Sequence, residues 1–141
     1  MRSFVTAAAL GAAMLAVIPA IGATAVAVDA DRKIESAVLR ADATTGRAWV
    51  EVTLVRRFLN GKEARKPGTA INVAVPELTF DRATNRVSIG TGDNSVTCAT
   101  LEGELRATGA CRIDASIEPH VVDTGFGTAT GERLVVAVVA R

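Results

Sequence analysis

Hydrophobic and polar residues alternate with a period of two along much of the chain. In RAWVEVTLVR (residues 47–56), the even-numbered positions before Arg56 are apolar and the odd-numbered positions are more polar. Such alternation is typical of a β-strand with one face against a core. The segments INVAV (71–75) and CRIDASIE (111–118) repeat it, and no segment beyond residue 28 shows a helical period over a helical length. The residues predicted to face the core are Ala48, Val50, Val52, Leu54, Ile71, Val73, Val75, Cys111, Ile113, Ala115 and Ile117.

Turn signals separate these predicted strands. DATTGR (42–47) and DRATNR (81–86) each begin with Asp and have Gly46 or Asn85 before the final Arg. The Asp carboxylate can accept backbone N–H groups of a turn, and Gly or Asn can adopt the left-handed conformation that closes it. LNGK (59–62) suits a type I′ turn, and GTGDNS and ATGA supply further breaks. The spacing predicts an all-β fold, an antiparallel β-sandwich or partly closed barrel of about seven to nine short strands.

The C-terminal segment ERLVVAVVAR is apolar on both faces. Leu134, Val136, Val138 and Ala140 would share one face. The other face would hold Val135, Ala137 and Val139. Because a sandwich strand usually exposes one face to water, two interpretations stay open. The segment is a central strand covered by a loop, or it is an association strand that forms a homo-oligomer or binds a partner.

The first 28 residues have the features of an export signal. A single cation, Arg2, precedes an uncharged apolar run that ends at Pro19, and two overlapping Ala-x-Ala patterns follow. We predict a signal peptide over residues 1–25, cleaved after Ala25 or Ala27, followed by a single β domain over residues 26–141. The expected location is periplasmic or secreted, with no stable membrane span after cleavage. The uncharged run is also long enough for an uncleaved anchor.

Net charge and cysteine content narrow the class of protein further. Cleavage of the signal peptide would remove Arg2 and leave 15 of the 16 basic residues, equal in number to the 15 acidic residues, so the net charge would be zero. A neutral exported domain is a poor binder of nucleic acid. Cys98 and Cys111 are predicted to form a disulfide, as expected after export. Two cysteines and one histidine, His120, supply too few soft ligands for a closed zinc site, so no metal or other cofactor is predicted.

The segment VVDTG (121–125) resembles the motif that presents the catalytic carboxylate of aspartic proteases. That resemblance implies a small homodimeric aspartic hydrolase that uses Asp123, because the chemistry needs two carboxylates that share a proton. The alternative is that Asp123 caps a Gly-rich turn between two strands. We favour the cap, since only 16 residues follow Gly125, and we assign no catalytic residue.

A basic run interrupts the predicted strands between residues 56 and 66. It is either a solvated edge or a patch for an anionic partner. Its cations are Arg56, Arg57, Lys62, Arg65 and Lys66. Among the few aromatic residues, Trp49 is the candidate for stacking on a sugar. Together these features predict an exported, non-enzymatic β-sandwich that binds a protein or a cell-envelope component.

Overall fold

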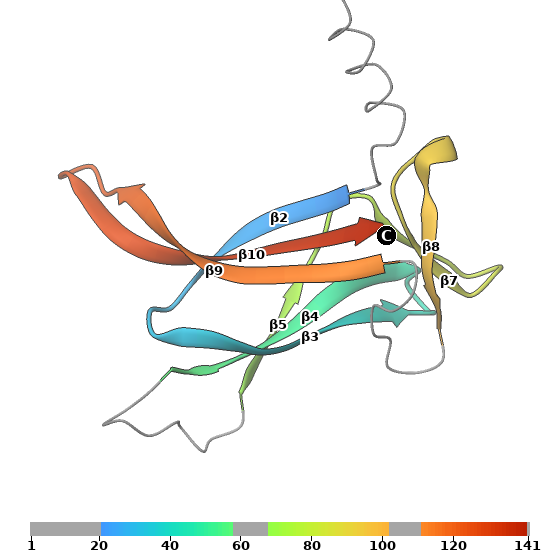
Figure 1. The fold of residues 1–141 in the computed structure, drawn as a ribbon, viewed down its shortest axis with the longest axis horizontal. Coiled ribbons are helices and arrows are strands. Elements are labelled where there is room, and N and C mark those ends of the chain that lie inside the picture. Colours follow the sequence, from blue (N-terminus) through green and yellow to red (C-terminus); the bar gives the residue numbers. More distant parts are fainter. Residues whose placement is uncertain (1–20, 58–67, 102–110, 141) are drawn as a thin grey trace, which may run out of the picture.

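The computed structural model describes residues 21–57, 68–101 and 111–140 (Figure 1). These ranges hold nine strands and one short 3-10 turn, Gly92–Asn94, and no α-helix. The strands are β2 (Ile21–Val28), β3 (Arg32–Asp42), β4 (Arg47–Arg56), β5 (Thr69–Val73), β6 (Leu78–Asp81), β7 (Arg86–Ile89), β8 (Val96–Thr100), β9 (Cys111–Asp123) and β10 (Thr128–Ala140). The prediction of an all-β fold is therefore confirmed. Strands β9 and β10, with 13 residues each, are longer than the short strands expected.

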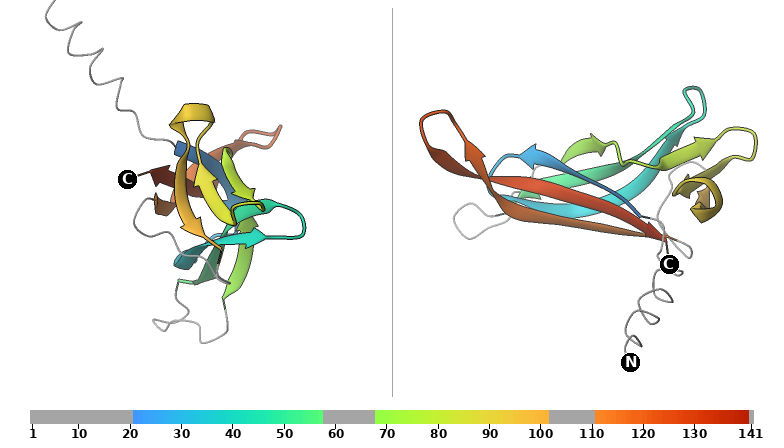
Figure 2. Two further views of the ribbon diagram at one scale, coloured as in Figure 1. Left: turned by 90° about the vertical axis from the view of Figure 1, so that its right-hand side faces the viewer. Right: turned by 90° about the horizontal axis from the view of Figure 1, so that it is seen from above.

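The strands form three antiparallel sheets of three strands each. Their orders are β2-β10-β9, β3-β4-β5 and β6-β7-β8. Figure 2 shows the first two sheets running along the length of the molecule and the third sheet at one end. One continuous hydrophobic core joins the inner faces of all three sheets.

The core follows the period-two pattern of the sequence. Val50, Val52 and Leu54 of β4 are at most 3% exposed, and Leu134 of β10 is fully buried. The predicted inward residues Val73, Val75 and Cys111 are buried as well. Five further members of the predicted set pack against the core while partly buried, namely Ala48, Ile71, Ile113, Ala115 and Ile117. Alternation along each strand thus placed the correct face inward.

The C-terminal strand β10 is central in its sheet. It pairs with β2 over Glu132–Val139 and with β9 over its whole length. Association through a free backbone edge of this segment is therefore excluded over Glu132–Val139, because both edges are already paired, whereas association through its outward side chains stays a prediction. The outward side chains of Val135, Ala137 and Val139 remain half-buried.

Both predicted Asp-initiated hairpins are present. Gly46 and Asn85 have positive φ, at 72° and 59°. In the first hairpin, the backbone N–H of Thr44 donates to Asp42 Oδ1 at 2.8 Å, and in the second Ala83 donates to Asp81 Oδ1 at 2.9 Å. This N–H bond lowers the pKa of Asp81, because it favours the ionised carboxylate. The predicted turns LNGK and ATGA lie outside the described residues.

A disulfide joins Cys98 of β8 to Cys111 at the start of β9, as predicted. It links the third sheet to the first, and both cysteines are buried in the core. A disulfide is compatible with an extracellular or periplasmic location. In the part of the chain that the structure describes, no helix has the length and apolar character to cross a membrane.

Residues 21–28, which contain the two expected cleavage sites, form strand β2. Every residue of β2 has a partner in β10, from Ile21 opposite Val139 to Val28 opposite Glu132. The side chains of Val26 and Val28 pack against the core. This segment is thus part of the folded sheet.

Candidate functional site

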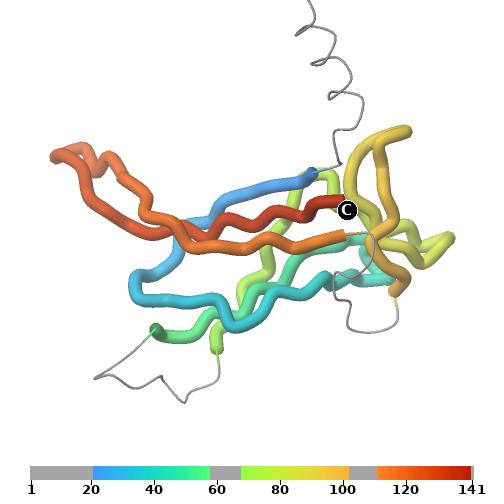
Figure 3. The backbone as a smooth tube through the Cα atoms, viewed as in Figure 1, coloured from blue at the N-terminus to red at the C-terminus, as the bar shows by residue number. Residues whose placement is uncertain are grey.

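Strands β9 and β10 continue past the end of β2 as a two-stranded arm, which we define as residues 120–131. Within the arm each strand pairs only with the other, from His120 opposite Gly131 to Asp123 opposite Thr128. The arm projects at the end of the molecule opposite the third sheet (Figures 1 and 3). All residues from 121 to 130 are exposed, so the arm stands clear of the body of the protein.

The turn at the tip of the arm is fixed by hydrogen bonds. Asp123 Oδ1 accepts from the backbone N–H of Gly125 at 2.9 Å. The backbone N–H of Thr124 donates to the carbonyl of Gly127 at 3.0 Å, and the Thr124 hydroxyl accepts from the N–H of Phe126 at 3.3 Å. Gly125 and Gly127 have φ of 83° and 138°, a region that suits glycine. The Asp123 carboxylate caps a Gly-rich turn, as the sequence indicated.

This hydrogen-bonded turn presents an aromatic side chain to solvent. Phe126 is 102% exposed, and behind it on the arm Val121 and Val122 are 65% and 42% exposed. Successive strand residues point to opposite faces, so the two valines place one exposed apolar side chain on each face of the arm. Large exposed apolar side chains grouped in one place mark interaction sites. The arm is therefore the candidate binding element.

Sequence reasoning did not single out Phe126. The signal that could have found it is the tripeptide Gly-Phe-Gly after Asp-Thr, which places a bulky apolar side chain at a turn. A turn residue between two strands has few neighbours to cover it. Only the projection of the arm leaves this side chain without contacts.

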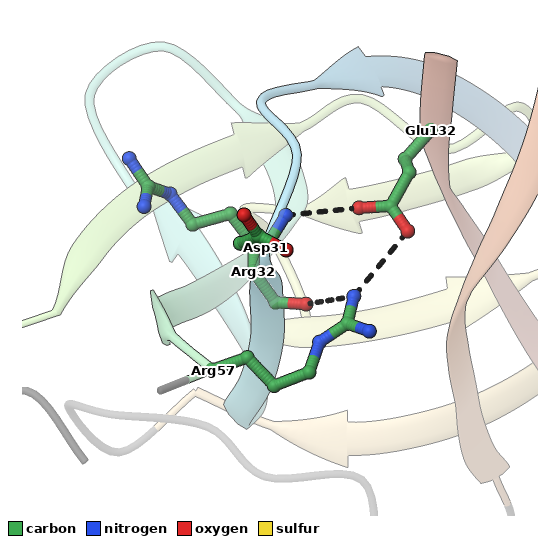
Figure 4. Close-up of polar contacts among 4 residues, drawn as sticks. All are labelled: Asp31, Arg32, Arg57 and Glu132. Atoms are coloured by element: carbon green, nitrogen blue, oxygen red, sulfur yellow. Dashed lines mark hydrogen bonds and ion pairs between the residues drawn. The ribbon is translucent and has the colours of Figure 1, made fainter. Parts of the chain in front are cut away.

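Polar contacts anchor the base of the arm to neighbouring elements (Figure 4). Glu132 Oε1 accepts from the backbone N–H of Asp31 at 3.2 Å, and Glu132 Oε2 pairs with Arg57 Nη2 at 3.3 Å. The same Arg57 nitrogen donates to the carbonyl of Arg32 at 3.4 Å. Exposed ion pairs contribute little stability. Here they connect the base of the arm to the β2–β3 connection and to the residue that follows β4.

A second ion pair braces the two strands at the base of the arm. Arg133 Nη2 of β10 lies 3.0 Å from Glu118 Oε1 of β9, directly across the ladder. Opposite charges at such cross-strand positions stabilise the pairing. The arm thus begins from a braced pair of strands.

Part of the predicted basic patch lies at this end of the molecule. Arg57 binds Glu132 within the chain, and Arg56 lies opposite Arg32 in the β3–β4 ladder. Lys62, Arg65 and Lys66 lie outside the described residues. Binding of an anionic partner by this patch stays a prediction.

The outer face of the first sheet carries a row of small apolar side chains. The register aligns Val135, Ala137 and Val139 with Ala25, Ala23 and Ile21. Ile21 is 47% exposed, and the two alanines are exposed as well. The predicted association residues therefore share an apolar outer face with β2.

Trp49 lies in a shallow surface pocket of about 350 Å³ on the second sheet. The pocket is also lined by Arg47, Asn72 and Asp42. The indole Nε1 of Trp49 is buried and has no hydrogen-bond partner among the described residues. Because this nitrogen is inaccessible to solvent, it cannot donate to a bound sugar, and stacking of a sugar on the ring of Trp49 stays a prediction.

His120 stands at the base of the arm and Asp123 at its tip. Across residues 21–57, 68–101 and 111–140, no group of three or more His, Cys, Asp or Glu side chains could hold a metal ion. The chain matches no family model, no curated protein and no solved structure. The arm is accordingly interpreted from its own geometry.

Proposed function

We propose that this chain is an exported, non-enzymatic β-sandwich that binds a protein partner in the periplasm or outside the cell through the arm. The first two sheets would be the two layers of the sandwich. The observation that carries the proposal is the complete exposure of Phe126 at the tip of a hydrogen-bonded turn.

The energetics favour a protein with an apolar pocket. Burying a Phe side chain contributes about 2 kcal/mol, and aromatic residues dominate the binding energy at interfaces. Because the turn at Asp123–Gly127 is already ordered, little conformational entropy is lost on binding. Val121 and Val122 would extend the contact along both faces of the arm.

Export supports the same proposal. The disulfide between Cys98 and Cys111 is the kind found in oxidising compartments. An envelope or secreted protein partner would meet the arm there. The capping role of Asp123 accounts for the Asp-Thr-Gly motif without catalysis, because the carboxylate orders the turn that carries Phe126.

Site-specific photo-cross-linking tests the proposal. A phenylalanine analogue that carries a benzophenone replaces Phe126 in the protein expressed in its host cells. In a matched control variant the analogue replaces Ala83, an exposed turn residue of the third sheet. We expect one discrete protein adduct from position 126 and none from position 83. Absence of an adduct at position 126, or the same adducts from both positions, would show that the arm is not the binding element.

A further inference from the structure

Strand β2 lies at the edge of the first sheet, and its inward face helps to cover the core. Its inward residues Gly22, Thr24 and Val26 lie opposite Val138, Val136 and Leu134. Those three β10 side chains are fully buried. Residues 21–28 therefore belong to the folded domain.

Gly22 shows how tightly β2 fits. It is buried, and a Cβ atom at this position would overlap the carbonyl oxygen of Pro76 and lie 2.7 Å from Ile89 Cδ1. Only glycine permits so close an approach of the backbones. Strand β2 thus contacts β7 of the third sheet at Gly22 and pairs with β10 along its whole length.

The far end of β2 is held as well. The connection to β3 donates the Asp31 N–H to Glu132, and Arg57 completes this clamp. Both ends of the β2 segment are therefore held by contacts with residues that are distant in the sequence.

Cleavage at the positions expected from the Ala-x-Ala patterns would break this strand. A cut after Ala25 would remove Ile21–Ala25, five of the eight residues that pair with β10, and a cut after Ala27 would leave only Val28. The backbone groups of Val135–Val139 that face β2 would then lose their partners. They would form a new sheet edge open to water, and the buried side chains of Val136 and Val138 would lose the strand that helps to cover them.

We propose that export processing instead cuts the Ala20–Ile21 bond, so that the mature chain begins with β2. This inference rests on the predicted export signal and not on the proposed binding function. Ala20 supplies the small residue next to the bond, and Pro19 ends the apolar run just before it. Ile18 departs from the Ala-x-Ala pattern, but this bond is the one that leaves β2 complete.

The reaction is a peptide hydrolysis catalysed by the export machinery. Water adds across the Ala20–Ile21 bond, its hydroxyl going to the Ala20 carbonyl carbon and its proton to the Ile21 nitrogen. The new ammonium group would begin the strand opposite Val139.

Expression of the full chain in an exporting bacterial host tests the site. Mass spectrometry of the exported protein should find Ile21 as the N-terminus. The substitution Ala25→Leu disrupts both Ala-x-Ala patterns, because Ala25 belongs to each of them. Ala25 is exposed on β2, so the larger side chain should be tolerated, and we expect the Ile21 terminus to be unchanged. In Ala20→Leu, we expect the Ile21 terminus to disappear.

Other termini would overturn the proposal. A wild-type protein that begins at Val26 or Val28 would show that β2 is removed, and an intact Met1 would show that no processing occurs. An Ile21 terminus that persists in Ala20→Leu would also contradict it. These measurements need no binding partner, so their outcome is independent of the cross-linking at Phe126.

Discussion

Replacing Leu134 by Ala tests which face of β10 packs in the core. Leu134 is fully buried between β2 and β9, opposite Val26 and Ile117. Truncating a fully buried Leu to Ala costs about 3 kcal/mol, from lost burial and from the cavity left behind. A domain of this size has roughly 5–15 kcal/mol of stability, so the variant should fold with a much smaller margin.

Urea denaturation of the oxidised protein measures this cost. With an m value of about 1.5 kcal/mol/M, the unfolding midpoint should fall by about 2 M. The matched control is Val135→Ala on the same strand, whose side chain lies half-buried on the outer face. It should cost less than about 1 kcal/mol. Equal shifts for Leu134→Ala and Val135→Ala would refute the assignment of the inner face.

Three further predictions concern single contacts. Reduction of the Cys98–Cys111 bridge, which spans 13 positions, should cost about 3 kcal/mol; an unchanged urea midpoint in dithiothreitol would contradict this. The pKa of Asp81 is lowered from its ordinary value of 3.8 by the Ala83 N–H, so its stabilising effect is complete above that value and is lost as pH falls through the lower folded pKa. Thermal scans should therefore show wild type more stable than Asp81→Asn at pH 6, with a difference that shrinks as the pH falls below 3.8, whereas a difference independent of pH would exclude this linkage. Asp123→Asn should keep the photo-adduct from position 126, because an amide oxygen can also accept the hydrogen bond from the Gly125 N–H. A peptidase activity at acidic pH that is lost in Asp123→Asn would instead favour the hydrolase alternative.

Local sequence patterns were sufficient for the strand faces and turns. The alternation around Val50 and Val52 identified the buried face of β4, because a strand side chain has only two directions available. The Asp-initiated turns ending at Gly46 and Asn85 were likewise predictable, since their hydrogen bonds join residues two apart. The disulfide followed from cysteine number and the expected compartment.

The arrangement of strands required the tertiary structure. The run Leu134–Ala140 fits both a central strand and an association edge, and only its pairing with β2 and β9 decides between them. Strands β2 and β10 lie near opposite ends of the described chain, and period-two alternation says nothing about which edges meet. The length of the arm depends on the same information, because the arm begins where β2 ends.

Residues 21–28 show this division most clearly. Their small, uncharged composition suits the end of an export signal and equally an edge strand, so the sequence alone could not separate the two. The tertiary structure places Gly22 against Pro76 and pairs the whole segment with β10. The sequence by itself determined which residues can form strands and turns here, whereas the close backbone packing between distant segments decided that these eight residues complete a sheet and that Phe126 stands free of it.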